Sequence, residues 1–150
     1  MRFLLVDRIT EWVPGGRVRG VKCVAMSEDF LEHHFPGNPV MPGVLMLEAL
    51  LQLAAWGEAA SSQFSRWLLL RRVRRCGFYE LARPGDTIEL EVEPLGGADG
   101  NRRSYRGLGA VGGGKRIVAE FEAELWPLAD LADPEVQRAA FDILTREGRG

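Results

Sequence analysis

Two side chains in the first third of the chain, a carboxylate and an imidazole, have the chemistry of an acid–base pair. Glu48 is the only charged residue between Gly43 and Trp56, in a segment that is otherwise mostly apolar. Because an ionised carboxylate is costly in apolar surroundings, we expect Glu48 to gain a polar partner or to hold its proton more strongly than an exposed carboxyl. A carboxyl group held in this way is a candidate general acid.

His34 stands fourteen positions before Glu48, in a segment rich in proline. A histidine takes up and releases protons near neutral pH, which suits a general base. The three prolines between the two residues restrict the backbone and lower the entropy cost of holding the imidazole in place. Gly43 stands near the start of the apolar segment, where the free backbone N–H of a first helical turn can stabilise an oxyanion. One short segment therefore offers a base, an acid and an oxyanion donor.

Each of these features also has a structural interpretation. A loop histidine is more often structural or solvated than catalytic, and an apolar helix by itself indicates only that it lies in the core. A lone carboxylate in such a helix is the better sign of chemistry, although structural ion pairs occur in the same setting. Residue types and spacing alone leave both interpretations open.

The elements that must position these residues are one long helix and several strands. Apolar and charged residues alternate over 87–93 and 115–126, which predicts strands with one buried and one solvated face, as in antiparallel sheets. Apolar side chains cover every side of 43–60, so we expect a helix that is buried all round by a sheet rolled about it. The predicted strands are 9–13, 17–26, 67–79, 87–93, 103–111 and 115–126, and a short helical piece is predicted over 28–32.

A second helix is predicted at the end of the chain. Asp133 can cap it, Pro134 suits its first position, and it would run to about Arg146. Its expected apolar stripe consists of Val136, Ala140, Phe141 and Leu144. The fold class is therefore α+β in a single domain over residues 1–150, with a core at about 3–126 and a C-terminal extension at 127–150.

Composition narrows the function classes. The 150 residues carry a formal net charge of -2, which gives no global reason to expect nucleic acid or an anionic membrane as partner. The two cysteines, Cys23 and Cys76, are expected to be buried free thiols in a reducing compartment. We expect no signal peptide and no membrane span, because 1–6 is too short and 44–56 fits a core helix, so the expected location is cytoplasmic.

A family resemblance lies between residues 34 and 52. It consists of HFPG at 34–37, PVMPGVL at 39–45, EA at 48–49 and a glutamine at 52, and it resembles the signature of the 3-hydroxyacyl-acyl carrier protein dehydratases, in their FabZ branch. FLLVDR at 3–8 and PGD at 84–86 extend the resemblance, which covers about residues 3–126. This family has the hot-dog fold, an antiparallel sheet wrapped around one helix.

The resemblance implies roles for individual residues. His34 abstracts a proton from C2 of the substrate, and Glu48 protonates or orients the departing 3-hydroxyl, directly or through water. The backbone N–H of Gly43 polarises the thioester carbonyl. The oxyanion and substrate-binding residues implied in this way are Gly43, Phe35, Pro42 and Val44. No cofactor and no metal are implied.

The resemblance also implies partners. The substrate is a 3-hydroxyacyl thioester of acyl carrier protein, and the histidine and carboxylate of one site come from different protomers. A dimer is then the smallest active unit, and some family members assemble three dimers into a hexamer. Glu48 favours simple dehydration, because the sister branch that also isomerises its product typically has Asp there.

Two parts of the chain depart from the family pattern. Phe78 is flanked by Gly77 and Tyr79 where basic residues are usual, and LAR at 81–83 replaces a more apolar approach to the turn. The segment after Pro127 lies outside the core resemblance. The motif therefore does not set the preference for the length of the substrate's acyl chain.

Arginines crowd into the predicted strand 67–79. They form either a solvated face or a docking surface for an acidic carrier protein. The candidate docking residues are Arg71, Arg72, Arg74 and Arg75, with Arg102, Arg103 and Arg106 as possible additions.

Two other functions compete with dehydration. A hot-dog thioesterase also uses a carboxylate on its central helix, but thioesterases of this fold do not normally carry the loop that contains His34. A non-catalytic acyl-binding subunit would not need His34, Gly43 and Glu48 together.

Overall fold

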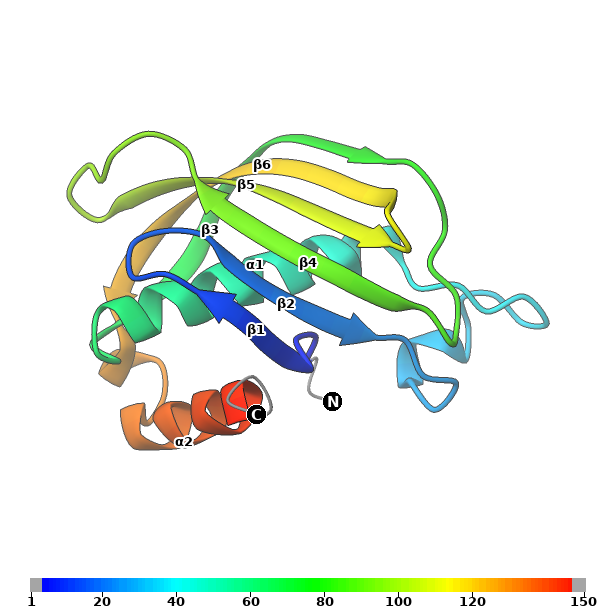
Figure 1. Cartoon of the computed structure of the whole chain (residues 1–150), viewed down its shortest axis with the longest axis horizontal. Coiled ribbons are helices and arrows are strands. Elements are labelled where there is room, and N and C mark those ends of the chain that lie inside the picture. The colour runs from blue at the N-terminus through cyan, green and yellow to red at the C-terminus, as the bar shows by residue number, and fades with distance from the viewer. Residues whose placement is uncertain (1–3, 147–150) are drawn as a thin grey trace.

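The structure is a computed structural model that describes residues 4–146. A six-stranded antiparallel sheet in the order β1-β2-β4-β5-β6-β3 curves around the long helix α1 (Gly43–Ser61), as Figure 1 shows. This is the arrangement that the hot-dog expectation describes. The strands are β1 (Arg8–Trp12), β2 (Val18–Cys23), β3 (Arg66–Phe78), β4 (Thr87–Pro94), β5 (Arg102–Val111) and β6 (Gly114–Pro127). The remaining elements are the 3-10 turns η1 (Asp29–Leu31) and η2 (Leu128–Asp130) and the helix α2 (Pro134–Thr145).

The core lies between the inner face of the sheet and one side of α1. The inward residues of β4 and β6 are buried, which confirms the alternation expected from the sequence. Glycines set the distance between the layers: a Cβ at Gly57 would lie 2.5 Å from Cγ2 of Val18, and one at Gly107 would lie 2.9 Å from Cδ1 of Leu50. Helix and sheet therefore approach more closely than any side chain at these positions would allow.

The prediction that α1 is buried all round is wrong for the single chain. Val44 is 66% exposed, and Leu47 and Leu51 are only partly buried. The physical reason is that the sheet covers one side of the helix and leaves the other open. By length and composition α1 could cross a membrane, but half of its apolar window is buried inside this fold, as in the core helix of a globular domain.

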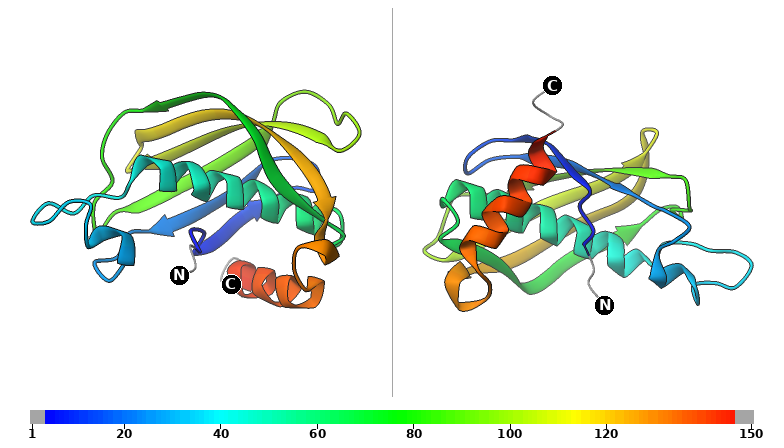
Figure 2. Two further views of the ribbon diagram at one scale, coloured as in Figure 1. Left: turned by 180° about the vertical axis from the view of Figure 1, so that it is seen from behind. Right: turned by 90° about the horizontal axis from the view of Figure 1, so that it is seen from below.

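Helix α2 packs across the roll beside β1 and α1 (Figure 2). Asp133 caps it as predicted, and its Oδ1 accepts a hydrogen bond from the backbone N–H of Glu135 at 2.9 Å. The buried Phe141 ring lies 5.6 Å from Trp12 and 5.5 Å from Phe64, measured between ring centroids. Val136 is 60% exposed, so its place in the predicted stripe is wrong, because the helix turns toward the core the face that carries Phe141.

The two cysteines differ from the prediction that both are buried. Cys23 is exposed and Cys76 is half-buried, and both are free thiols. Cys23 faces outward because the inner face of β2 and its extension is taken by Val18, Gly20, Lys22 and Val24. Partial burial raises the pKa of the Cys76 thiol.

Candidate active site

The loop between η1 and α1 carries His34 and extends beyond the N-terminal end of α1 (Figure 1). The imidazole Nδ1 lies 3.0 Å from the carbonyl oxygen of Val40. A carbonyl oxygen only accepts hydrogen bonds, so in the neutral ring Nδ1 carries the proton and Nε2 carries the free lone pair. The His34 backbone carbonyl also accepts a hydrogen bond from the Val40 N–H at 2.8 Å. His34 is therefore oriented with Nε2 as its basic atom.

The rest of the loop is tied down at its base. Val40 and Met41 are buried, and the N–H of Met41 donates to the carbonyl of Ala82 at 2.8 Å. The tip is a turn in which Phe35 and Asn38 exchange backbone hydrogen bonds around Gly37 at φ +76°, a conformation that glycine adopts without strain. Val40, the partner of the His34 ring, thus belongs to the rigid part of the loop.

Glu48 lies on the partly covered side of α1. Its Oε1 accepts a hydrogen bond from Gln52 Nε2 at 3.2 Å, and Gln52 Oε1 accepts one from the backbone N–H of Leu5 at 2.9 Å. The expectation that Glu48 gains a polar partner is confirmed. Gln52 orients the carboxyl group and is itself oriented by the segment that precedes β1.

Gly43 is the first residue of α1, and Pro42 is its N-cap. Among residues 4–146 no backbone acceptor takes the N–H of Gly43, which agrees with the open donors of a first helical turn. The ring of Phe78 packs so closely against Gly43 that a Cβ would lie 2.7 Å from Phe78 Cε1. Val44, one residue on, is exposed. The segment that departs from the family pattern therefore touches the candidate oxyanion donor.

No direct polar contact joins the predicted acid and base, His34 and Glu48, in the part of the chain that the structure describes. A hollow of about 610 Å³ beside the loop is lined by Phe35 and Pro39, and neither His34 nor Glu48 lines it. Within residues 4–146, no three His, Cys, Asp or Glu side chains lie close enough together to hold a metal ion.

The arginines of β3 pair with glutamates of the neighbouring strand β6. Arg71 lies 3.1 Å from Glu124, and Arg72 and Arg74 each lie 3.5 Å from Glu122. Among the residues described, Arg75 has no ion pair. Carrier-protein docking by this strand stays a prediction, and three of the four charges are already partly balanced within the sheet.

Sequence reasoning missed two buried polar groups. Lys22 is 2% exposed on the inner face of β2. Its burial could have been predicted from the sequence, because it stands at every-second-residue spacing from Val18, Gly20 and Val24, which face the core. Tyr105 donates a hydrogen bond to Glu58 near the far end of α1. Burial raises the pKa of Tyr105 far above its ordinary value, and the Glu58 carboxylate adds to the shift.

Comparison with known proteins agrees with this geometry. The model of the FabA-like domain family matches residues 1–122. A 3-hydroxyacyl-[acyl-carrier-protein] dehydratase FabZ of Caulobacter vibrioides is 40% identical over 124 residues, which cover 81% of this chain and 77% of the relative. The enzyme of the same name from Chloroflexus aggregans is 41% identical over 133 residues and 88% of each chain.

A solved structure supports the fold independently. The fluoroacetyl-CoA thioesterase FlK superposes with a TM-score of 0.65 at 16% identity, covering 85% of this chain and 97% of that chain. At that identity the likeness shows the hot-dog fold alone. The family follows from the matched domain and from the two relatives: the chain belongs to the FabA-like domain family.

Proposed function

We propose that the chain removes water from (3R)-3-hydroxyacyl-acyl carrier protein and forms trans-2-enoyl-acyl carrier protein. The observation that carries this proposal is the hydrogen bond from His34 Nδ1 to the Val40 carbonyl, which leaves Nε2 as a basic atom of fixed orientation. The named relatives are 3-hydroxyacyl-[acyl-carrier-protein] dehydratases, and their similarity over most of the chain supports the same substrate class.

The reaction is an elimination that needs a base and an acid on either side of the C2–C3 bond. His34 Nε2 takes the proton from C2, and the electron pair of the broken C–H bond forms the C2=C3 double bond. The C3–O bond breaks, and Glu48 gives its proton to the departing hydroxyl, which leaves as water. The Gly43 N–H donates to the thioester carbonyl, where negative charge develops as C2 loses its proton.

We assign Glu48 as the acid because it lies on the rigid helix with a defined partner. The Gln52 amide holds one carboxyl oxygen and leaves the other oxygen for the substrate. Phe35, Pro42 and Val44 flank these groups in sequence, and their position at the loop tip and helix start supports a role in binding the acyl thioester.

A second copy of the chain completes the site in this proposal. The partly exposed side of α1 carries Val44, Leu47 and Leu51, and the neighbouring strand β3 exposes Leu69 and Leu70. β3 is also a 13-residue edge strand, and long open edges of this kind pair readily with another chain. A partner seated on this surface would bring its own His34 loop to Glu48, which would account for the lack of a direct polar contact between the two residues within one chain.

The remaining parts of the proposal concern context. The partner in catalysis is acyl carrier protein, the pathway is fatty acid or related lipid biosynthesis, and the location is cytoplasmic. The assembly is a dimer or a trimer of dimers. The arginines of β3, Arg75 first among them, are the proposed contact for the acidic carrier.

The test is hydration of a trans-2-enoyl thioester, followed by loss of enoyl absorbance, for the wild type, His34→Ala and Glu48→Gln. We expect an active wild type and a loss of about a hundredfold or more in each variant, the usual scale for removing an acid or base. A wild type that is inert on carrier-protein and coenzyme A thioesters, or variants that match it, would overturn the proposal. Release of free thiol without a change in the double bond would indicate a thioesterase.

A further inference from the structure

A lysine is buried on the inner face of the sheet, where every neighbour in phase with it is apolar or glycine. Lys22 is 2% exposed on β2, between Gly20 and Val24. Its Nζ lies 2.5 Å from Glu28 Oε1 and 3.5 Å from Asp7 Oδ2. Taking an ammonium group out of water costs several kcal/mol, on the order of the whole gain from its ion pairs. The stability of the fold therefore does not explain why this position holds a lysine, because a methionine of similar length would fill the same space without the cost of burying a charge.

The ion pair joins the rigid sheet to the segment that leads to His34. Glu28 stands directly before η1, and its carbonyl accepts a hydrogen bond from the N–H of Leu31 at 3.1 Å. The carbonyl of Leu31 in turn accepts one from the N–H of His34 at 3.4 Å. Two successive turns thus connect the Glu28 carboxylate, which Lys22 holds, to the backbone of the catalytic histidine.

His34 is consequently held from two directions. Downstream, Val40 fixes its ring and backbone carbonyl, and Met41 is bonded to Ala82. Upstream, Leu31 is buried in the core and anchors the turn through apolar contacts, which are not directional. The contact between Lys22 and Glu28 is short and charge-assisted, so it adds a polar restraint at the start of the same turn.

We propose that Lys22 is a positioning residue for catalysis: through Glu28 it sets the orientation of the turn that carries His34. This inference rests on the proposed role of His34 as the base. An error of about 1 Å in the placement of a catalytic group can lower the rate on the order of a hundredfold. A contact that adds little to the stability of the fold can therefore have a large effect on the reaction rate.

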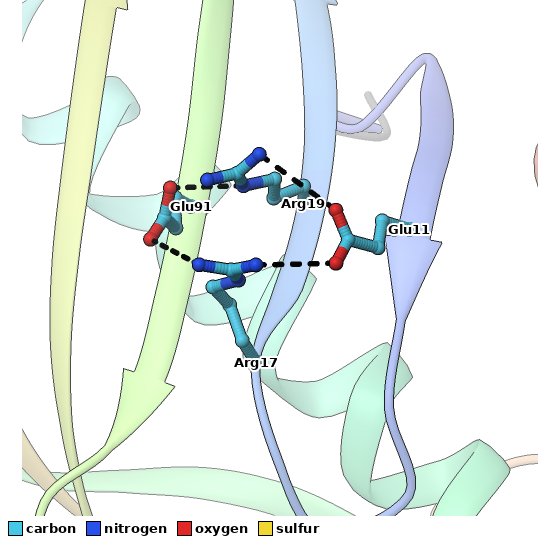
Figure 3. A network of polar contacts seen from close by, with 4 residues as sticks. All are labelled: Glu11, Arg17, Arg19 and Glu91. Carbon is cyan, nitrogen blue, oxygen red and sulfur yellow. Dashed lines mark hydrogen bonds and ion pairs between the residues drawn. The ribbon is translucent and has the colours of Figure 1, made fainter.

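The test compares Lys22→Met with Arg19→Met. Arg19 lies on the same strand but faces outward, in an exposed network with Glu11, Arg17 and Glu91 (Figure 3), and has no link to the loop. Lys22→Met leaves no fully buried carboxylate without a partner, because the side chains of Glu28 and Asp7 are 24% and 41% exposed and can be solvated. Both variants are expected to keep the melting temperature within a few degrees.

The expected result is a kcat for enoyl hydration about tenfold lower or more in Lys22→Met, with KM within about twofold, and wild-type kinetics in Arg19→Met. Glu28→Gln removes the charge of the acceptor and weakens the same contact, so it should lower kcat in the same direction, and the double variant should lose no more than Lys22→Met alone. If Lys22→Met does not fold, Glu28→Gln carries the test by itself.

A second readout is independent of turnover. The chain has two histidines, so the ring ¹⁵N signals of His34 can be assigned with a His33→Gln variant. We expect one Nδ1–H tautomer in the wild type and in Arg19→Met, and averaging toward the other tautomer in Lys22→Met. Unchanged kcat and unchanged ring signals in Lys22→Met would overturn the inference. An inert wild type would instead overturn the proposed function, and the ring signals would still decide whether Lys22 orients His34.

Discussion

The ring of Phe78 packs directly against the backbone of Gly43. A Cβ added at Gly43 would lie 2.7 Å from Phe78 Cε1, which is closer than two carbon atoms tolerate. Gly43→Ala must therefore push the Phe78 ring aside, and this ring is half exposed and free to move. We expect a stability change within about 1 kcal/mol, because alanine also favours the helix. The displaced ring lies beside the candidate oxyanion donor, so kcat/KM for enoyl hydration should fall about tenfold.

The control for this prediction is the double variant Gly43→Ala, Phe78→Ala. Without the ring there is nothing to displace, so the double variant should recover activity relative to Gly43→Ala. If both variants are equally impaired, the contact between Gly43 and Phe78 is not the cause of the loss.

Mixing inactive variants tests whether the site is shared between two chains. A dimer of one His34→Ala chain and one Glu48→Gln chain has one site with both residues intact and one with neither. At equal mixing half of the dimers are of this kind, so about a quarter of the wild-type activity should return after the subunits exchange. No recovery, with exchange demonstrated by a tagged subunit, would place His34 and Glu48 of one chain in the same site.

The side chain of Gln52 has two roles that substitutions can separate. It accepts a hydrogen bond from the Leu5 N–H in the segment before β1, and it donates one to Glu48. Gln52→Leu removes the acceptor for the Leu5 N–H and the donor to Glu48, so we expect a loss of about 1–3 kcal/mol in unfolding free energy, together with reduced activity. Gln52→Glu keeps the acceptor for the Leu5 N–H but sets a second carboxyl group beside Glu48, so it should leave kcat low and recover stability only at a pH low enough for one of the two carboxyls to be protonated. Denaturant unfolding and initial rates separate the two effects; full activity in Gln52→Glu would contradict the orienting role.

Tyr105 makes the fold sensitive to alkaline pH. Its pKa is raised in the folded chain, first by burial and then by the hydrogen bond to Glu58, so the folded state keeps the proton longer than the unfolded state does. The stabilisation is complete below the ordinary tyrosine pKa of about 10 and is lost above it, at about 1.4 kcal/mol per pH unit. Unfolding free energies from pH 8 to 11 should fall more steeply for the wild type than for Tyr105→Phe. Parallel pH dependences would contradict this assignment.

Carrier-protein docking by β3 predicts a difference between substrates. Arg75 lacks a carboxylate partner among the described residues, so Arg75→Glu should raise KM for the carrier-protein substrate about tenfold and leave KM for the coenzyme A thioester within about twofold. Added salt should weaken the first reaction and spare the second. Equal effects on both substrates would show that these arginines only stabilise the sheet.

The regular elements were predictable because their patterns are strong and local. β4 and β6 alternate without interruption, and α1 begins after a proline and is mostly apolar. A hydrophobic pattern reports that a surface is covered but not by what, which is why the open side of α1 escaped prediction. Val136 was misplaced for a similar reason, since several apolar residues of α2 compete for one buried face.

Two features of the site were not predicted from the sequence. One depends on a backbone group, and the other depends on which residues of a strand face the core. The tautomer of His34 is set by a carbonyl of Val40, and every residue has a carbonyl, so no residue type marks it. Cys23 is exposed, against the prediction, and Lys22 is buried because pairing with β4 fixes the inner face of β2, where Lys22 is opposite Ile88. One residue of phase decides which of the two is buried.

The contact between Trp12 and Phe141 has a consequence for synthesis of the chain. Trp12 ends β1 and Phe141 lies in α2, so the first hairpin is completed by a contact with a segment that is synthesised much later. Until α2 is in place, the rings of Trp12, Trp56 and Phe64 lack their contact with Phe141, and we expect them to form an exposed apolar surface. Helix α2 is therefore also the element that protects this end of the roll against aggregation.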